Sequence, residues 1–375
     1  MKSLKVAINA RTLADKTPRG WSRYTINLLR ALSAHPVHFL LMTDRPLNSH
    51  FLDQLPSGTF EVCHAPSTPY LYWEQSVLPR LCQKFRADLL HCPINYGLPI
   101  LSPCPKVLTL HDAILEVFYQ KQLSTKEKIH PSALKVKFIN WASRRFADAV
   151  ITVSNHAKSD LISHLHLPEH KITVIYEAAD PIFLTQPSPA HITSTLARLG
   201  VKRPFLFYIG GLEKRKNVRF LIDAHCKAKT NSQLVIGGGK PEEIAVLTSE
   251  YASSLDKLQF LGWVGDADLS SLYAGAQALV YPSLYEGFGL QICEALAMGC
   301  PVLVSDRASL PEIAGQGGIT FPLDKDSTLI RLIEKISTDA DFQEELAKRA
   351  IVRAKAFSWE ITAQKTWQVY QNVCR

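Results

Sequence analysis

Features of secreted, membrane-spanning and metal-binding proteins are scarce in this chain of 375 residues. No apolar run approaches the ~18 residues that a membrane helix needs. The start of the chain, residues 2–9, is too short for the core of a signal peptide and fits a first strand. None of the eight cysteines forms a C-x-x-C pair, so we expect free, mostly buried thiols in a reducing compartment. These absences predict a cytoplasmic protein without disulfides or zinc.

The charge balance narrows the choice of partners. A net charge of +8 fits nucleic acid, an anionic membrane surface or a phosphorylated substrate. No RNA- or DNA-binding motif accompanies the charge, so we expect no nucleic acid partner. The basic stretch 135–145 also contains Phe138 and Trp141. It fits a helix on the cytoplasmic face of a membrane, and equally a helix with one face in the core and the other in water.

Short apolar runs alternate with helical patterns in two series, which predicts an α/β chain of two Rossmann-like domains with parallel sheets. We expect an N-terminal domain at 1–182, a C-terminal domain at 183–357 and an amphipathic helix within 358–375. If the domains face each other, the carboxyl ends of their strands would place ligand sites in the cleft between them. The expected strands are 4–8, 38–42, 89–91, 107–110, 149–153, 172–175, 205–209, 233–236, 258–261, 278–281 and 302–304.

The most informative segment is 281–300, which reads YPSLYEGFGLQICEALAMGC. Local rules predict a strand, a tight turn, a helix that begins near Phe288 or Gly289, and a further strand. Free backbone N–H groups at such a helix start attract anions. Glu286 lies just ahead of these amides, and Glu294 lies about one and a half turns into the helix. One loop thus offers amides to a phosphate and two carboxylates to hydroxyl groups, which is the chemistry of holding a sugar nucleotide.

A second candidate site follows the expected strand 205–209. Gly210 and Gly211 allow a ligand to approach the backbone closely. Arg215 and Lys216 can neutralise a pyrophosphate that gains charge as it departs. The structural alternative is a basic surface turn in which the next residue, an asparagine, caps a helix.

Two weaker candidates lie in the first domain. His111 follows a strand directly and can hydrogen-bond a substrate hydroxyl or shuttle a proton, although a lone histidine is often purely structural. Gly20 permits a tight turn against a ligand, with Ser22 as the N-cap of a helix at 22–32. The alternative is that Gly20 is an ordinary loop glycine without a ligand. The three D-x-D triplets lie where carboxylates are favoured without a metal, so we assign no metal site.

Together these sequence motifs resemble those of glycosyltransferase family 4, whose members are retaining enzymes of the GT-B fold. The resemblance extends along nearly the whole chain. The resemblance rests on NAR at 9–11, G-x-x-R-Y at 20–24, WEQ at 73–75, LHD at 110–112, AVITVS at 149–154, RKN at 215–217, FLG at 260–262, the two glutamates with seven residues between them at 286–294, and FSWE at 357–360. Two departures stand out. Gly211 replaces an arginine that many relatives carry, and Ser22 replaces the second glycine of the N-terminal loop.

The resemblance implies a role for each candidate. It implies that Glu286 contacts hydroxyls of the transferred sugar, that Glu294 binds the ribose, and that His111 approaches the donor sugar near the acceptor. The final helix would cross back to the first domain. Donor contacts would also come from Gly20, Gly210, Gly211, Arg215, Lys216 and the backbone of Gly287, Phe288, Gly289 and Leu290.

We therefore expect a retaining hexosyltransferase of envelope polysaccharide or lipopolysaccharide synthesis that needs no cofactor or metal. The combination of Trp73-Glu-Gln with Arg215-Lys-Asn resembles bacterial polysaccharide mannosyltransferases and favours GDP-mannose as the donor. The acceptor would be a glycan or a lipid-linked sugar. No carboxylate stands out as a nucleophile, which favours a front-side route in which the leaving phosphate takes the acceptor proton. A UDP-sugar donor, a sugar-nucleotide epimerase and a non-catalytic binding module remain as alternatives.

Overall fold

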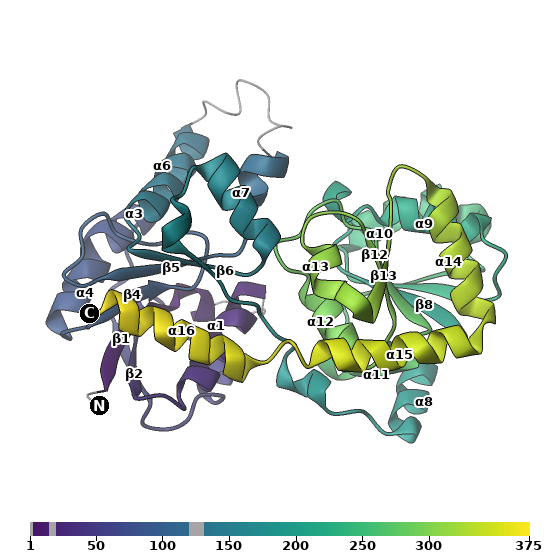
Figure 1. The fold of residues 1–375 in the computed structure, drawn as a ribbon, viewed down its shortest axis with the longest axis horizontal. Coiled ribbons are helices and arrows are strands. Elements are labelled where there is room, and N and C mark those ends of the chain that lie inside the picture. The colour runs from purple at the N-terminus through teal and green to yellow at the C-terminus, as the bar shows by residue number, and fades with distance from the viewer. Residues whose placement is uncertain (1–2, 15–19, 120–130) are drawn as a thin grey trace. The chain divides into compact units, whose positions relative to one another are not determined.

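The structure, a computed structural model, describes residues 3–14, 20–119 and 131–375. The chain forms two compact units, one of Met1–Glu177 with Ser358–Arg375 and the other of Ala178–Phe357 (Figure 1). The chain therefore returns to its first unit at its C-terminal end. No helix in the described ranges is long and apolar enough to cross a membrane.

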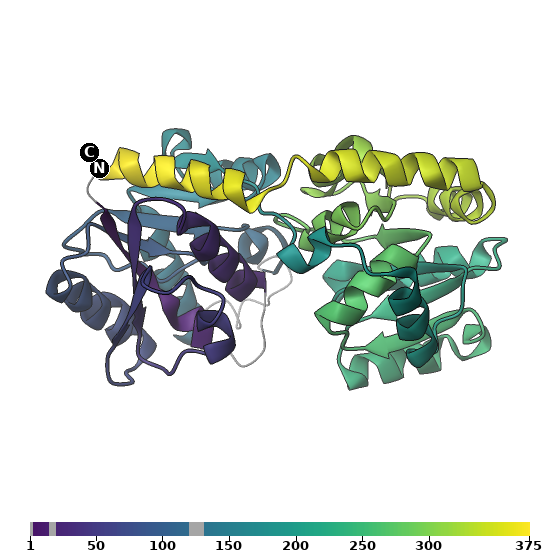
Figure 2. The same ribbon diagram turned by 90° about the horizontal axis from the view of Figure 1, so that it is seen from below.

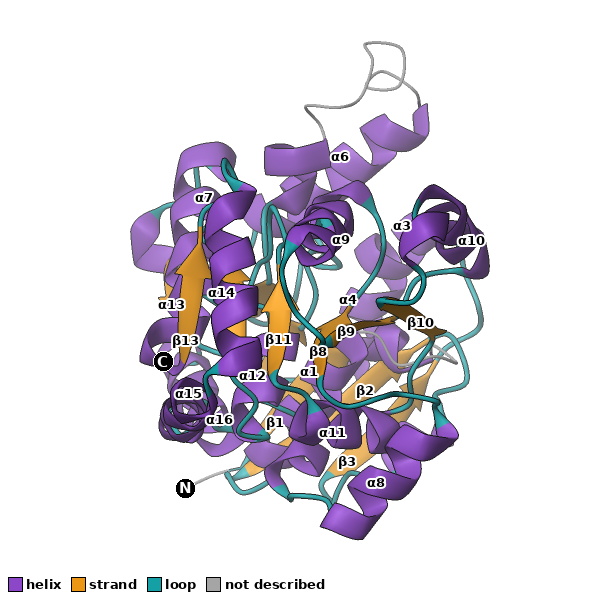
Figure 3. Ribbon diagram, turned by 90° about the vertical axis from the view of Figure 1, so that its right-hand side faces the viewer, coloured by secondary structure: helices purple, strands orange, loops and turns teal. Residues whose placement is uncertain are grey.

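The first unit is built on a parallel sheet in the order β3-β2-β1-β4-β5-β6-β7. Its central strands are buried on both faces, as expected where helices cover a sheet on either side (Figure 3). The strands are β1 (Leu4–Asn9), β2 (Val37–Thr43), β3 (Phe60–His64), β4 (Leu89–Cys92), β5 (Lys106–Leu110), β6 (Ala149–Thr152) and β7 (Ile172–Val174). The helices are α1 (Gly20–Leu32), α2 (Ser49–Leu52), α3 (Tyr70–Tyr72), α4 (Leu78–Lys84), α6 (Pro131–Arg145), α7 (Asn155–Leu165) and α16 (Trp359–Val373).

Helix α16 is the element that carries the C-terminus back to the first unit, where it packs against α1 (Figures 1 and 2). Its buried face includes Ala363, Trp367 and Tyr370, whereas Ile361 is exposed. Burying each large apolar side chain contributes about 1.5–3 kcal/mol. The Tyr370 hydroxyl also lies 2.6 Å from Nδ1 of the buried His91. Packing and this hydrogen bond together hold the last helix on the first sheet.

The second unit contains a parallel sheet in the order β10-β9-β8-β11-β12-β13. The strands are β8 (Phe205–Ile209), β9 (Gln233–Gly237), β10 (Leu258–Gly262), β11 (Ala278–Tyr281), β12 (Val302–Ser305) and β13 (Gly318–Phe321). The helices are α8 (Pro189–Arg198), α9 (Val218–Lys227), α10 (Pro241–Glu250), α11 (Asp266–Gly275), α12 (Leu290–Ala297), α13 (Leu310–Ala314), α14 (Asp326–Thr338) and α15 (Ala340–Ala354).

The strand order reverses once in each sheet. In the first sheet the chain runs outward from β1 through β2 to β3, then starts again on the other side of β1 with β4. In the second sheet the same change occurs between β8 and β11. In open α/β sheets ligands bind outside the carboxyl ends of the strands at such a point. Each unit therefore has one topologically favoured place for a ligand.

Every strand expected from the sequence is present, within one residue at each end, and two were missed. The missed strands are β3 and β13, which lie at sheet edges. Three of the five residues of β3 are exposed, so its sequence has no buried apolar run. One expectation is wrong: Ser22 lies inside α1, and its hydroxyl donates to the carbonyl of Thr12 instead of capping the helix.

Candidate active site

The two loops that flank the strand reversal in the second unit carry the strongest sequence candidates. Gly210 and Gly211 directly follow β8, and the loop 282–289 directly follows β11. The backbone N–H of Leu284 donates to the carbonyl of Arg215 at 2.8 Å. The side-chain amide of Asn217 donates to the carbonyl of Pro282 at 3.3 Å. These bonds tie the two loops together, so that residues about 70 positions apart in sequence share one site.

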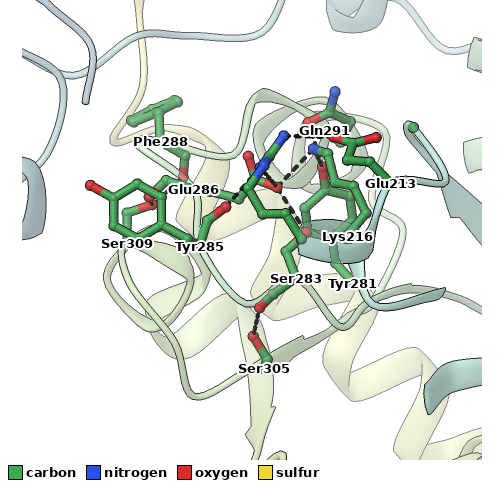
Figure 4. A network of polar contacts seen from close by, with 12 residues as sticks. Glu213, Lys216, Tyr281, Ser283, Tyr285, Glu286, Phe288, Gln291, Ser305 and Ser309 are labelled. Carbon is green, nitrogen blue, oxygen red and sulfur yellow. Dashed lines mark hydrogen bonds and ion pairs between the residues drawn. The ribbon is translucent and has the colours of Figure 1, made fainter. Parts of the chain in front are cut away.

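The centre of this site is the carboxylate of Glu286 (Figure 4). Its Oε1 atom lies 2.9 Å from Nη1 of Arg215 and 2.7 Å from Nζ of Lys216. The same oxygen accepts a hydrogen bond of 2.8 Å from the Ser283 hydroxyl. Burial raises the pKa of Glu286, but the charges of Lys216 and Arg215 outweigh it and leave the pKa below its ordinary value. The carboxylate is therefore ionised at neutral pH and binds two cations.

Both cations have further partners that fix their positions. Nζ of Lys216 donates to the hydroxyl of Tyr281 at 2.8 Å, and that hydroxyl donates to Oε1 of Gln291 at 3.1 Å. Nη1 of Arg215 donates to the carbonyl of Tyr285 at 2.7 Å. These contacts hold both cations in place before a ligand binds, which is the preorganisation that electrostatic catalysis requires.

The turn into helix α12 is held by one serine and one glycine. The Ser309 hydroxyl contacts the carbonyl oxygens of Glu286 and Phe288 at 3.0 and 2.8 Å. Gly289 has a φ of +103°, a conformation that residues with a Cβ rarely adopt. Helix α12 then begins at Leu290, just after the predicted start near Phe288 or Gly289. The Ile292 amide already donates to the Gly289 carbonyl at 2.9 Å. The amides ahead of it belong to the start of the helix, where an anion finds free donors.

Glu294 lies on the same helix, separate from the charged cluster. It is buried, and its Oε2 accepts a hydrogen bond of 2.8 Å from the Tyr273 hydroxyl. Burial raises the pKa of Tyr273, and the neighbouring Glu294 carboxylate adds to that effect. The tyrosine is therefore protonated and orients one carboxylate oxygen of Glu294.

The side chain of Glu213 occupies the place that a side chain at position 211 would need. A Cβ at position 211 would meet Oε2 of Glu213 at 1.9 Å. Glu213 in turn pairs through Oε1 with Nη2 of Arg215 at 2.9 Å. The backbone of Gly210 is also closely packed, because the loop after β9 brings Gly238 against it. A Cβ added to Gly238 would meet the Gly210 carbonyl oxygen at 2.0 Å. Glu213 is thus a second carboxylate on Arg215, and any side chain at position 211 would displace it.

His111 lies in the first unit, at the end of β5, with both of its ring nitrogens in hydrogen bonds. Nδ1 lies 2.8 Å from Oε1 of Glu177, and Nε2 lies 3.1 Å from the carbonyl of Pro93. Both partners are acceptors when Glu177 is ionised, so the ring carries two protons. Burial lowers the pKa of His111, but Glu177 and the Pro93 carbonyl outweigh it and raise the pKa above its ordinary value. In this arrangement neither ring nitrogen can accept a proton.

The contact between His111 and Glu177 predicts that the variant Glu177→Gln has a changed His111 pKa. Without the carboxylate, only the Pro93 carbonyl and Asp112 oppose the effect of burial, so the pKa of His111 should fall. In the native chain the raised pKa stabilises the fold below pH 6.5, and this contribution is lost as pH rises through the higher folded pKa. Imidazole NMR shifts across a pH titration measure both values. An unchanged His111 pKa in the variant would contradict this account.

Gly20 is the first residue of α1 and is exposed. A Cβ there would meet no described atom within 4 Å, so the described fold does not itself require glycine. Within the described residues, no three His, Cys, Asp or Glu side chains gather where they could hold a metal ion.

Sequence reasoning missed the residues that orient the candidates. Tyr281 and Ser283 lie inside the segment that it singled out, and only their contacts distinguish them from ordinary strand and turn residues. Glu213 stands within the basic cluster and could have been suspected as a partner for a cation. Glu177 and Ser309 are respectively 66 and 23 residues from the groups that they contact, and no local pattern marks them.

Two family models and several named relatives place this chain among the glycosyltransferases. The family model described as "Glycosyltransferase Family 4" matches residues 18–182, and the model described as "Glycosyl transferases group 1" matches residues 197–353. O-antigen chain mannosyltransferase B of Escherichia coli is 31% identical over 265 residues, which are 68% of this chain and 69% of that protein. Serotype-specific mannosyltransferase WbdA of Escherichia coli is 30% identical over 226 residues, 58% of this chain but only 28% of that longer protein.

Solved structures share the fold along the whole chain. Anabaena HepE in complex with UDP and glucose matches this chain with a TM-score of 0.75 at 20% identity. The match covers 98% of this chain and 99% of that chain. WaaG, a glycosyltransferase involved in lipopolysaccharide biosynthesis, has the same TM-score at 16% identity, with 98% of this chain and 99% of that chain covered. At such low identity these likenesses establish the GT-B fold and nothing finer.

Proposed function

The chain belongs to glycosyltransferase family 4 and is an enzyme that transfers sugar, and from this premise we propose that it moves mannose from GDP-mannose to a hydroxyl of a glycan or lipid-linked acceptor in cell-envelope polysaccharide synthesis. The observation that carries the proposal is the contact of Glu286 with both Arg215 and Lys216 at the strand reversal of the second unit. The likeness to O-antigen chain mannosyltransferase B supports mannose as the sugar.

The contacts of Glu286 support separate roles for its two oxygens. Three donors, from Arg215, Lys216 and Ser283, reach Oε1. Oε2 would be the oxygen that accepts from a hydroxyl of the donor sugar. Glu294, with one oxygen oriented by Tyr273, would bind the ribose hydroxyls.

Arg215 and Lys216, together with the amides at the start of α12, would hold the diphosphate. Bond breaking moves negative charge onto the leaving phosphate, and fixed cations stabilise that charge more in the transition state than in the ground state. The acceptor hydroxyl would attack on the face that the leaving group departs from, and its proton would pass to the leaving phosphate oxygen. The doubly hydrogen-bonded ring of His111 is consistent with this route, because the route needs no histidine base. No metal ion or cofactor is required by these steps.

The donor is tested by screening nucleotide sugars for a thermal shift and then for transfer. We expect GDP-mannose to raise the melting temperature more than GDP alone or UDP-glucose, since a ligand that binds only the folded state stabilises it. A larger shift with UDP-glucose would overturn the choice of base. An isomerised donor after incubation without acceptor would instead indicate an epimerase, and an unaltered donor with a crude lipid acceptor would indicate a binding module.

Contact with a membrane is a second part of the proposal and rests on α6. Phe138 and Trp141 on this helix are 44% and 52% exposed, beside the exposed cations Lys137 and Arg145. Exposed aromatic rings among cations favour an anionic lipid surface. Vesicles containing phosphatidylglycerol should therefore carry the protein through a flotation gradient at low salt, and Trp141→Ala should weaken this by several-fold. Trp263→Ala, which removes an exposed tryptophan from the second unit, is the control; equal flotation of both variants would contradict contact through α6.

A further inference from the structure

Helix α16, the last helix of the chain, reaches the pair of His111 and Glu177 through one buried hydroxyl. Thr362 on this helix is 2% exposed, and its hydroxyl donates to the carbonyl of Tyr176 at 2.7 Å. The same hydroxyl lies 2.9 Å from the carbonyl of Ser358 in its own helix, so the bond to Tyr176 is the shorter of the two. Tyr176 directly precedes Glu177, whose Oε1 lies 2.8 Å from Nδ1 of His111. The last helix thus binds the backbone one residue away from the carboxylate that holds this histidine.

The segment that carries Glu177 depends on contacts with other elements. It follows β7, and residues 175–180 are neither helix nor strand. Its backbone groups therefore have no regular ladder of hydrogen bonds to hold them. The amide of Ile175 donates to a carbonyl of β6 at 2.8 Å, and the carbonyl of Tyr176 accepts from Thr362. These bonds fix the chain directly ahead of Glu177, so the loss of either would allow its carboxylate to shift.

A second chain of contacts joins α16 to His111. The Tyr370 hydroxyl lies 2.6 Å from Nδ1 of His91, and Nε2 of that ring lies 2.9 Å from the Thr109 hydroxyl. The Tyr24 hydroxyl lies 3.3 Å from Oγ1 of Thr109. The rings of Tyr24 and His111 meet edge to face, with centroids 4.6 Å apart at 85°. All five residues are buried, and close packing leaves such a chain of contacts little freedom to rearrange.

Among the charged and titratable groups described around His111, Glu177 has the largest influence. Burial lowers the pKa of His91, on β4, to about 3, so this ring is neutral. Burial raises the pKa of Tyr24, on α1, so its hydroxyl is neutral as well. Asp112, the next residue in the chain, raises the pKa of His111 less than Glu177 does. The charge of His111 therefore depends mainly on where Glu177 is held.

We propose that Thr362 is a positioning residue for His111: by fixing the backbone ahead of Glu177, it keeps this carboxylate on the histidine ring. The part that His111 plays in sugar transfer rests on the proposed function, whereas the placement of its ring does not. Tyr370 supports the same ring through the second chain of contacts. The docked α16 is then a requirement for a correctly placed His111, and it links the end of the chain to the chemistry of the first unit.

The test uses Thr362→Val, which keeps the shape of the side chain but cannot donate to Tyr176. We expect the His111 pKa, measured by imidazole NMR on the full chain without substrate, to fall because Glu177 is held less firmly against it. We expect kcat to fall by about three- to tenfold, the effect of one net hydrogen bond. Thr362→Ser keeps the hydroxyl and should restore both values.

Thr366→Val is the matched control. Thr366 is fully buried on the same helix, and its hydroxyl donates to the carbonyl four residues earlier at 2.8 Å, as Thr362 does to Ser358. Among the described residues, its hydroxyl bonds to nothing outside the helix. Both valine variants should lose a similar amount of melting temperature, since each loses a buried hydroxyl. Thr366→Val should leave the His111 pKa and kcat unchanged.

The outcomes separate this inference from the proposed function. An unchanged His111 pKa in Thr362→Val, or an equal change in Thr366→Val, would overturn the positioning role and leave Thr362 a purely structural residue. Thr362→Ala removes the same hydroxyl and gives the same test if the valine variant does not fold. Absence of transfer from GDP-mannose by the native chain would count against the proposed function, and a lower His111 pKa in Thr362→Val would still support the positioning role.

Discussion

Lys216→Ala should lower kcat by about 10²–10³ while leaving the fold intact. Nζ of Lys216 is buried at the strand reversal and lies 2.7 Å from Glu286 and 2.8 Å from the Tyr281 hydroxyl. In the proposed reaction this charge stabilises the leaving diphosphate, and its interaction is stronger in the transition state than in the bound donor. Alanine removes that difference, so the loss should appear mainly in kcat and less in KM for the donor. Steady-state kinetics with GDP-mannose and an acceptor extract measures both.

Lys214→Ala is the matched control for this prediction. Lys214 belongs to the same short turn, Lys214–Lys216, but it is exposed. It carries the same charge and should change kcat by less than about threefold, because exposed charges contribute little. Near-normal kcat in Lys216→Ala, or equal losses in both variants, would contradict the assignment of Lys216 to the diphosphate.

Local rules are sufficient to predict much of the donor loop. The apolar run before Tyr281, the glycines around Phe288 and the proline after Cys300 predict a strand, a turn and a helix from neighbouring residues alone. Glu286 and Glu294 are consequently placed on the loop and on the helix. The glycosyltransferase fold follows from the same alternation repeated along the chain, because buried parallel strands need helices between them.

Partners from distant segments are harder to predict. The pairing of Glu286 with Arg215 depends on β8 and β11 being neighbours in the sheet, and strand order cannot be read from the sequence of either strand. The bond of Glu177 to His111 requires the segment after β7 to return to the end of β5. The error at Ser22 has a local cause instead, because α1 begins at Gly20, before the residue that resembled a cap.

Glu286→Gln should lower both activity and stability. Glutamine keeps the shape of the side chain but removes the charge that faces Arg215 and Lys216, and we expect kcat to fall by about 10²-fold because both cations lose the group that positions them. Breaking a buried ion pair by removing one partner costs about 3–5 kcal/mol, and the 12% exposure of the Glu286 side chain places this case near the lower end. Glu344→Gln, which removes a carboxylate from an exposed pair with Lys348, should change neither activity nor melting temperature.

The pH dependence of that stability difference distinguishes lost charge from lost packing. The folded-state pKa of Glu286 is below its ordinary value of 4.5, so its ion pairs stabilise the native chain fully above that pH. The contribution is lost as pH falls through the folded-state pKa, since the protonated carboxyl no longer attracts the two cations. The gap in melting temperature between the native chain and Glu286→Gln should therefore be largest near neutral pH and should shrink below pH 4.5. A gap that stays constant across this range would show that glutamine disturbs packing and that the charge of Glu286 contributes little.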